Sequence, residues 1–222
     1  MLHAGTLFAV TAYFLKDWIN LLKEGFLSLK EGTFKGIPER KIFWLLIIAT
    51  IPAAFIGKMF EAETETVFRN PGLISLTMVG FAILFFLVDR KSPRTKTLHE
   101  INIADAILIG ISQALAIIPG VSRSGITIVT ALGLKFNREA ATKFSFLLSA
   151  PIILGATLIN ISKIIGSTGK LNLLIGFLGS AVSGLLAIHF LLSFVKRHTF
   201  NLFVIYRIIF GLSIMSVLFF RH

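Results

Sequence analysis

The sequence contains no cysteine. This absence excludes disulfides, thiol nucleophiles and cysteine-based metal sites, and it leaves the compartment open. Acidic residues are scarce, with 11 Asp and Glu against 22 Lys and Arg. The sequence also lacks a Walker-type glycine loop, a zinc-ligand spacing and a Ser-His-Asp candidate. At its start we find neither the basic residues nor the cleavage site of an ordinary signal peptide.

The composition is that of a membrane protein. Hydrophobic residues make up 55% of the 222 residues, and the mean hydropathy is +0.85. Such a chain is too apolar for a soluble domain. The formal net charge of +11 would suit nucleic-acid binding, but the basic residues lie in short segments between apolar runs. That distribution is typical of membrane topology signals, so we expect a lipid bilayer and no nucleic acid as partner.

Apolar runs predict an all-α polytopic membrane protein with about six transmembrane helices in a single membrane domain over 1–222. The runs cover 2–15, 42–60, 73–88, 144–162, 171–195 and 202–220. The first is short for a span of about 20 residues, so we expect its helix to begin upstream. Pro52 lies inside the second run and is tolerated where neighbouring helices satisfy the freed backbone group. Between these two runs, 16–41 is predicted to be a charged loop with a short amphipathic or surface segment.

Basic residues predict the orientation in the membrane. Fifteen of the 22 Lys and Arg fall in four segments, namely 16–41, 90–100, 135–143 and 196–201. Five fall on the opposite side, and Arg123 and Arg207 lie within apolar segments. The excess of basic residues predicts that the four segments are cytoplasmic.

The stretch 117–134, IIPGVSRSGITIVTALGL, contains a helix break. Pro119 drives the preceding residue out of helical geometry, and Gly120 tolerates unusual backbone angles. The second arm, 122–134, spans about 20 Å of helix against a hydrocarbon core of about 30 Å. Because both flanking loops are predicted to be cytoplasmic, we expect a re-entrant helix pair over about 101–134. Non-helical backbone at that depth is allowed only next to protein or water, so the tip is predicted to be a site.

Polar residues at this break predict a phosphate site. Ser122, Arg123 and Ser124 would occupy the first turn of the second helix, where free N–H groups and the helix dipole attract anions. Thr127 shares their face. Gln113 would project into the same interior, to bind a ligand or to make an interhelical hydrogen bond. Alternatively, Arg123 caps carbonyls of a neighbouring helix, and the hydroxyls line helix contacts.

Other polar residues have less specific interpretations. Arg207 in the last run either faces a polar cavity, pairs with an acid or snorkels towards an interface. His189 is expected to be a helix-contact residue. Asp105 is expected to complement a helix dipole. The trio Glu61, Glu63 and Glu65 resembles a weak metal site, but we expect a solvated loop.

The residues around the break also carry a family resemblance. IGISQALAIIPGVSRSGITI closely resembles the second signature, P-G-x-S-R-S-x-x-T, of the bacterial undecaprenyl-diphosphate phosphatases, the bacitracin-resistance family. The defined positions are filled by Pro119, Gly120, Ser122, Arg123, Ser124 and Thr127. AGTLFAVTAYFLKDW upstream and VSGLLAIHFLLSFVKRHTFNLFVIYRIIFGL downstream are similar to helices of the same family, so the likeness covers almost the whole chain.

The resemblance implies an enzyme that removes one phosphate from undecaprenyl diphosphate for cell-wall synthesis and confers bacitracin resistance. It also implies an inverted repeat in the bacterial inner membrane, a polyprenyl diphosphate substrate, and a divalent cation, Mg²⁺ or Ca²⁺. We assign catalytic roles to Arg123, which would clamp the diphosphate, and to Ser122 and Ser124. Substrate-binding roles are assigned to Gly120, Thr127, Gln113 and Arg207.

The family's first signature, a Glu-containing stretch ending in L-P-x-S-S-x-G-H, should precede position 1. It carries acidic residues implicated in metal binding and a Ser or His implicated in attack. We find no metal ligands in the present sequence, and we expect the chain by itself to bind its lipid without hydrolysing it. A transporter or lipid flippase is the alternative, since broken helices also build transport sites. The oligomeric state and the nucleophile are left open.

Overall fold

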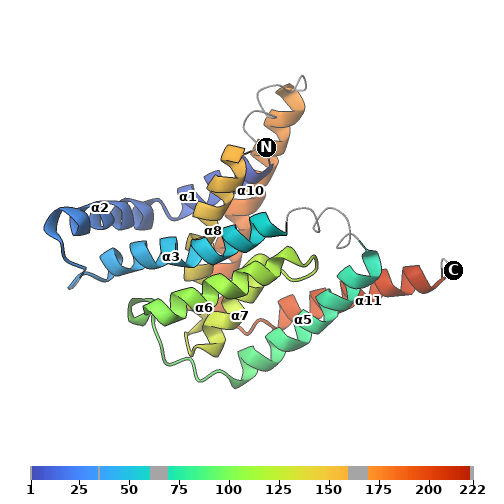
Figure 1. Ribbon diagram of the computed structural model, residues 1–222. Helices are drawn as coiled ribbons and strands as arrows, with labels where there is room; N and C mark the ends of the chain where they lie inside the picture. Colours follow the sequence, from blue (N-terminus) through green and yellow to red (C-terminus); the bar gives the residue numbers. More distant parts are fainter. Residues whose placement is uncertain (1, 35, 61–69, 160–169, 221–222) are drawn as a thin grey trace.

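The computed structural model describes residues 2–34, 36–60, 70–159 and 170–220 (Figure 1). Within these ranges the chain forms helices and one isolated β-bridge, which confirms the all-α prediction. The helices are α1 (Leu2–Tyr13), α2 (Leu15–Glu31), α3 (Pro38–Met59), α5 (Pro71–Lys91), α6 (Ile103–Ala114), α7 (Arg123–Gly133), α8 (Arg138–Ile159), α10 (Lys170–Val195) and α11 (Asn201–Phe220). Two short 3₁₀ helices, η2 (Leu98–Glu100) and η3 (Leu115–Ile117), flank α6.

Five of these helices are long and apolar enough to cross a membrane: α3, α5, α8, α10 and α11. Each matches one of the apolar runs, and Pro52 lies inside α3 as expected. Helix α1 has 12 residues, about 18 Å, so the first run is short, as its sequence indicated. Asn70 caps α5 through its side chain, and Pro71 takes the first helical position, where its missing N–H costs nothing.

The helices pack mainly in pairs. Helix α1 lies against α10, α5 against α11, and α3 against α6, while α7 contacts α5, α6 and α8 (Figure 1). Small residues allow close approach between α1 and α10, since Gly184 faces Ala9 there. Between α5 and α11, the Phe85 ring packs on Phe200 with centroids 4.7 Å apart. The α6–α7 pair therefore lies between α3, α5 and α8, and one face of α6, with Leu108 and Ile111, stays exposed.

The structure corrects two predicted loops. The segment 16–41 is mostly helical, because α2 runs from Leu15 to Glu31, although its amphipathic character was expected. The basic segment 135–143 is also largely helix, since α8 begins at Arg138. In α2 the charged residues lie along the whole helix, and in α8 they lie in its first turns; both sets were taken for a loop. The acidic trio Glu61, Glu63 and Glu65 lies outside the described residues.

The α6–α7 pair enters and leaves on the same side of the molecule. Helices α6 and α7 contain 12 and 11 residues, so each extends less than about 20 Å. The segment before α6 and the one after α7 lie side by side: the Lys96 N–H donates to the Lys135 carbonyl at 2.8 Å, and the Asn137 N–H donates to the Lys96 carbonyl at 2.9 Å. This is the arrangement of a re-entrant pair.

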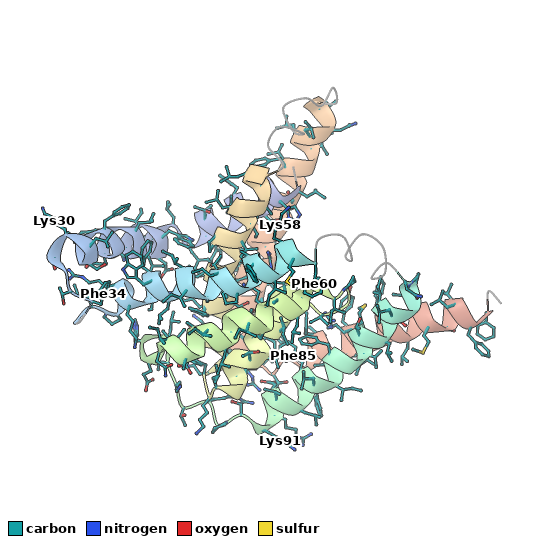
Figure 2. The ribbon with its side chains drawn as sticks, viewed as in Figure 1. Lys30, Phe34, Lys58, Phe60, Phe85 and Lys91 are labelled. Carbon is teal, nitrogen blue, oxygen red and sulfur yellow. The ribbon has the colours of Figure 1, made fainter. Side chains whose placement is uncertain are left out.

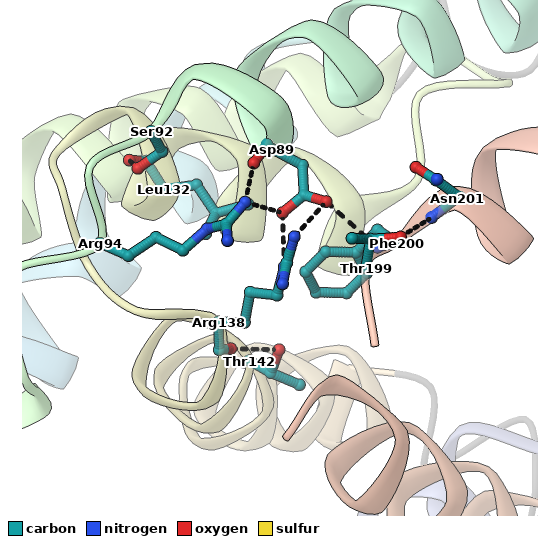
Figure 3. Close-up of polar contacts among 9 residues, drawn as sticks. All are labelled: Asp89, Ser92, Arg94, Leu132, Arg138, Thr142, Thr199, Phe200 and Asn201. Carbon is teal, nitrogen blue, oxygen red and sulfur yellow. Dashed lines mark hydrogen bonds and ion pairs between the residues drawn. The ribbon is translucent and has the colours of Figure 1, made fainter. Parts of the chain in front are cut away.

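A buried ion-pair cluster joins the helix ends at that side (Figure 3). The carboxylate of Asp89, 3% exposed at the end of α5, accepts from Arg138 Nε at 2.7 Å and Nη2 at 3.0 Å. It also accepts from the Phe200 N–H at 3.2 Å, and Arg94 Nη2 lies 3.6 Å away. Asp89 thereby connects α5, α8 and the loop before α11.

Candidate anion site at the broken helix

The break between α6 and α7 depends on two residues. Helix α6 tightens into η3, and the chain then turns at Pro119 and Gly120. Gly120 has φ +91°, in the left-handed region that favours glycine. A Cβ there would also collide with the Thr77 hydroxyl and the Ile74 carbonyl on α5. Thr77 Oγ1 donates to the Pro119 carbonyl at 2.6 Å, so α5 holds the break in place.

Arg207 supports this turn from α11. Its Nη2 donates to the Gly120 carbonyl, and its guanidinium lies over the Phe81 and Phe203 rings, 5.1 and 5.4 Å from their centroids. The side chain is buried, at 6% exposed. Arg207 is not among the residues that line the cavity described below. Its position therefore does not support the assignment of Arg207 to direct substrate binding, and none of the three alternatives considered for it describes this contact.

Ser122 begins helix α7. Its Oγ accepts from the Gly125 N–H at 3.2 Å, the usual N-cap bond, and lies 3.4 Å from the Ser124 Oγ. The first turn of α7 thus contains Arg123 and Ser124, as predicted. Helix N-termini leave N–H groups unpaired and carry positive potential, so this end of α7 suits an anion.

A cavity of about 250 Å³ lies beside the start of α7. Helices α1, α6, α7, α8 and α10 all contribute to its wall. The polar lining residues are Thr6, Gln113, Arg123, Ser124, Thr127, Ser145 and Ser149. The remaining wall is apolar, and its residues are Val10, Phe146, Ile153, Gly184, Ala187 and Ile188. The cavity therefore combines one cation with hydroxyl and amide groups in an apolar surround.

Arg123 is the cation of this cavity. Among residues 2–34, 36–60, 70–159 and 170–220, its guanidinium has neither an ion pair nor a hydrogen bond. The alternative that it caps carbonyls of a neighbouring helix is thus not observed in the described residues. An unpaired guanidinium within a membrane segment is costly, and such residues mark ligand sites.

Gln113 reaches the same cavity from α6. Its side chain is 4% exposed, and its Nε2 has no hydrogen-bond partner among the described residues. A buried amide without a partner costs about 1–3 kcal/mol. The interhelical hydrogen bond considered for this amide nitrogen is absent from the described residues, so a ligand acceptor is the better partner.

Thr127 lies deeper in the cavity wall. Its hydroxyl contacts the Arg123 and Ser124 carbonyls at 3.1 and 3.0 Å and the Ser145 Oγ at 2.6 Å. Ser145 Oγ in turn donates to the Ser124 carbonyl at 3.3 Å. Thr127 is therefore held by protein groups and fixes the first turn of α7 against α8.

Three of the polar lining residues were not predicted: Thr6, Ser145 and Ser149. Ser145 and Ser149 are four residues apart in an apolar run, which places both on one face of α8. That spacing was the available signal. The sequence around Thr6 contains no comparable signal, because Thr6 reaches the cavity only through the way in which α1 packs against its neighbours.

Asp105 and His189 have the structural roles that were expected. The Asp105 carboxylate accepts from the Asn102 N–H at 3.1 Å in a capping box and pairs with Lys96 Nζ at 3.1 Å. His189 Nδ1 lies 3.2 Å from the Tyr13 hydroxyl, across the α1–α10 contact. Neither residue lines the cavity.

The cavity as described does not fit a divalent cation. Mg²⁺ and Ca²⁺ prefer carboxylate oxygens, and no Asp, Glu or His occurs among the lining residues that the structure describes. Nor does the described part of the chain contain any cluster of three or more His, Asp or Glu suited to a metal. We therefore derive no chemical step through a metal.

Comparison with known proteins confirms the predicted family resemblance. The family described as "Bacitracin resistance protein BacA" matches residues 1–213. The chain belongs to this BacA family. An undecaprenyl-diphosphatase of Desulforudis audaxviator is 46% identical over 216 residues, which cover 97% of this chain and 80% of the relative. The proteins of that name from Moorella thermoacetica and Elusimicrobium minutum are each 43% identical, over 100% and 96% of this chain and 82% and 80% of the relatives.

Proposed function

We propose that this BacA-family chain supplies the diphosphate-binding site of an undecaprenyl-diphosphatase of the bacterial inner membrane, an enzyme that converts the lipid diphosphate to undecaprenyl phosphate and inorganic phosphate. Membership of the family and the names of the relatives support the activity. The single observation that carries the assignment of the site is the unpaired Arg123 at the start of α7, inside a cavity of about 250 Å³.

Arg123 and the end of α7 would bind the diphosphate. A guanidinium matches two phosphate oxygens at once, and its charge counts for more in a site with apolar walls. The first N–H groups of α7 and the Ser124 hydroxyl would bind the remaining non-bridging oxygens. Gln113 Nε2 would donate to another oxygen, which satisfies its own unpaired donor.

The two serines have different positions. Ser124 lines the cavity, whereas Ser122 is the N-cap of α7 and is not a lining residue. We therefore propose that Ser124 contacts substrate and that Ser122 and Gly120 shape the turn. Attack on phosphorus also needs a base, and the described lining residues include none.

Hydrolysis is proposed to require Mg²⁺ or Ca²⁺ together with carboxylates beyond the lining residues. Phosphoryl transfer needs charge neutralisation and a positioned nucleophile, of which this cavity provides the positive charge and the binding groups. Transport by a flippase would use a similar break, but the names of the relatives favour hydrolysis.

The test is phosphate release from undecaprenyl diphosphate in detergent, with Mg²⁺ or Ca²⁺ added and then removed by a chelator. Residues 1–222 are compared with the undecaprenyl-diphosphatase of Desulforudis audaxviator, of which the match covers 80%. We expect metal-dependent release from this relative and little from residues 1–222, because the described lining residues include neither a carboxylate nor a base. Equal release from both would contradict the proposal that hydrolysis requires carboxylates beyond the lining residues. Transbilayer movement of the lipid without phosphate release, in vesicles, would contradict the proposed function.

A further inference from the structure

Helix α2 carries a seven-residue repeat, LKDWINL-LKEGFLS-LKE, over 15–31. One set of its apolar residues is spaced alternately by four and three residues, which places the set in a single stripe along the helix. They are Leu15, Ile19, Leu22, Phe26 and Leu29, and they are between 44% and 68% exposed. The opposite face is buried, with Leu21, Gly25 and Ser28. The stripe therefore points away from the protein.

The acidic residues of the repeat turn inwards and are all paired. Asp17 pairs with Lys143 at 2.6 Å. Glu24 and Glu31 both pair with Arg40, at 2.9 and 2.6 Å. These contacts attach α2 to the beginnings of α3 and α8, and they give every acidic group on the helix a basic partner within the chain.

The lysines of the repeat turn outwards. Lys16, Lys23 and Lys30 each follow a leucine of the stripe and recur every seven residues, so they form a row beside it. All three are exposed, and none has an ion pair within the described ranges. Figure 2 shows Lys30 at the far end of α2, on the side away from α3.

The connections of α2 place it at a membrane boundary. It follows α1, which packs on the spanning helix α10, and it precedes α3, which is itself long enough to span. It lies on the side that the basic residues predict to be cytoplasmic. The cytoplasmic leaflet carries anionic lipids, which attract basic segments next to spanning helices.

We propose that α2 lies in the headgroup region of the anionic leaflet, with its apolar stripe in the acyl boundary and Lys16, Lys23 and Lys30 against lipid phosphates. The stripe supplies apolar area, and lysine stems reach from that depth to the headgroups. In water the exposed apolar stripe would promote aggregation, whereas in the membrane the acyl chains of lipid cover it.

Charge argues against a second copy as the occupant. The stripe has the spacing of a coiled-coil seam, and such seams are usually flanked by opposite charges from two chains. Here the acidic residues are used within the chain, so an antiparallel pair of α2 helices would bring the two lysine rows together, and a parallel pair would offer the lysines no acidic partner. Like charges at that position are unfavourable.

The absence of cysteine allows a direct test with a single spin label. Phe26→Cys is labelled, and its collisions with oxygen and with a water-soluble nickel chelate are compared in vesicles. The vesicles contain phosphatidylcholine alone or phosphatidylcholine with phosphatidylglycerol. Thr95→Cys, in an exposed loop on the same side, is the aqueous reference. We expect the label at position 26 to favour oxygen, and more so with phosphatidylglycerol.

The lysines are tested by the triple variant Lys16→Gln, Lys23→Gln and Lys30→Gln. Each lysine is expected to favour the membrane-bound position of α2 on an anionic surface about fivefold. The triple variant should therefore lose the stronger preference for oxygen that phosphatidylglycerol produces at position 26. The control is Lys91→Gln, Lys135→Gln and Lys196→Gln, which removes the same charge from other positions on the same side and should keep the effect. Unchanged helical circular dichroism ensures that the variants are folded.

Two results would overturn the proposal. One is a label at position 26 that meets the nickel chelate as often as the label at position 95. The other is a short distance between the position-26 labels of two chains, measured by pulsed dipolar spectroscopy, which would assign the stripe to self-association.

Discussion

Two arginines lie within apolar segments, and they have different roles. Arg123 reaches a cavity and has no partner among the described residues, whereas Arg207 contacts the Gly120 carbonyl and two phenylalanine rings. In sequence, only the neighbouring Pro-Gly break distinguished Arg123. The role of Arg207 depends on α11 packing against α5, and no local pattern reports such a contact.

Gln113→Leu is expected to separate substrate binding from stability. Leucine removes an amide whose Nε2 is buried and unpaired, so the free energy of unfolding should stay the same or rise by up to about 1 kcal/mol. Binding of the lipid diphosphate should nevertheless weaken about tenfold, because one charge-assisted hydrogen bond is lost. Thermal unfolding and the Kd of a non-hydrolysable lipid diphosphate, measured on the same preparation, test this. A less stable variant with an unchanged Kd would make Gln113 a structural residue.

Gly120→Ala is expected to disrupt the turn. The positive φ costs alanine about 1–2 kcal/mol, and the added methyl would collide with the Thr77 hydroxyl and the Ile74 carbonyl. Gly133→Ala in α7 is the matched control, because nothing lies within 4 Å of a Cβ there. The control should be as stable as the parent or more so. Equal melting temperatures and activities for the two variants would refute the requirement for glycine at 120.

At the scale of elements, the helix break was predictable because its causes are local. Pro119, Gly120 and the N-cap Ser122 each act through their own backbone or their near neighbours, and α7 begins at Arg123, one residue after the start predicted for the second arm. Asp105 was likewise predictable as a helix-start residue. The ends of α2 and α8 were not, since charge alone does not distinguish a loop from a solvated helix end. The parts of the cavity wall that Thr6 and Ser149 form depend on tertiary packing, so their contribution became visible only in the structure.

Asp89→Asn is expected to destabilise the side of the molecule where α5, α8 and α11 meet. Asparagine removes the carboxylate that pairs with the largely covered guanidinium of Arg138, 14% exposed, which costs about 3 kcal/mol or more. Glu139→Gln is the control, because its ion pair with Lys196 is exposed, at 56% for both side chains. That pair should contribute less than about 1 kcal/mol. Thermal unfolding in detergent compares the two, and similar losses would contradict the bridging role of Asp89.

At the scale of the whole molecule, five helices in the part of the chain that the structure describes are long enough to cross a membrane, and the α6–α7 pair starts and ends on one side. Hydropathy and charge bias predicted this architecture because both act over whole segments. The pairing of α1 with α10 and of α5 with α11 required the structure.

The topology is tested with single cysteines in this cysteine-free chain. Thr95→Cys and Glu139→Cys flank the re-entrant pair, and Pro71→Cys lies at the opposite end of α5. In intact cells, a membrane-impermeant thiol reagent should label only the cysteine at position 71, and disruption of the cells should expose the other two. Labelling of only one of positions 95 and 139 from outside would rule out the re-entrant pair.

Arg123 is proposed to clamp the diphosphate, and a measurement of binding affinity tests this contact without requiring hydrolysis. The probe is undecaprenyl methylenediphosphonate, which cannot be hydrolysed, titrated calorimetrically into residues 1–222 in detergent. Arg123→Lys keeps the charge but loses the two-pronged contact, so its Kd should rise about tenfold or more. Arg197→Lys, in the loop before α11, should bind as the parent does. Equal Kd values for the parent and Arg123→Lys would contradict the account.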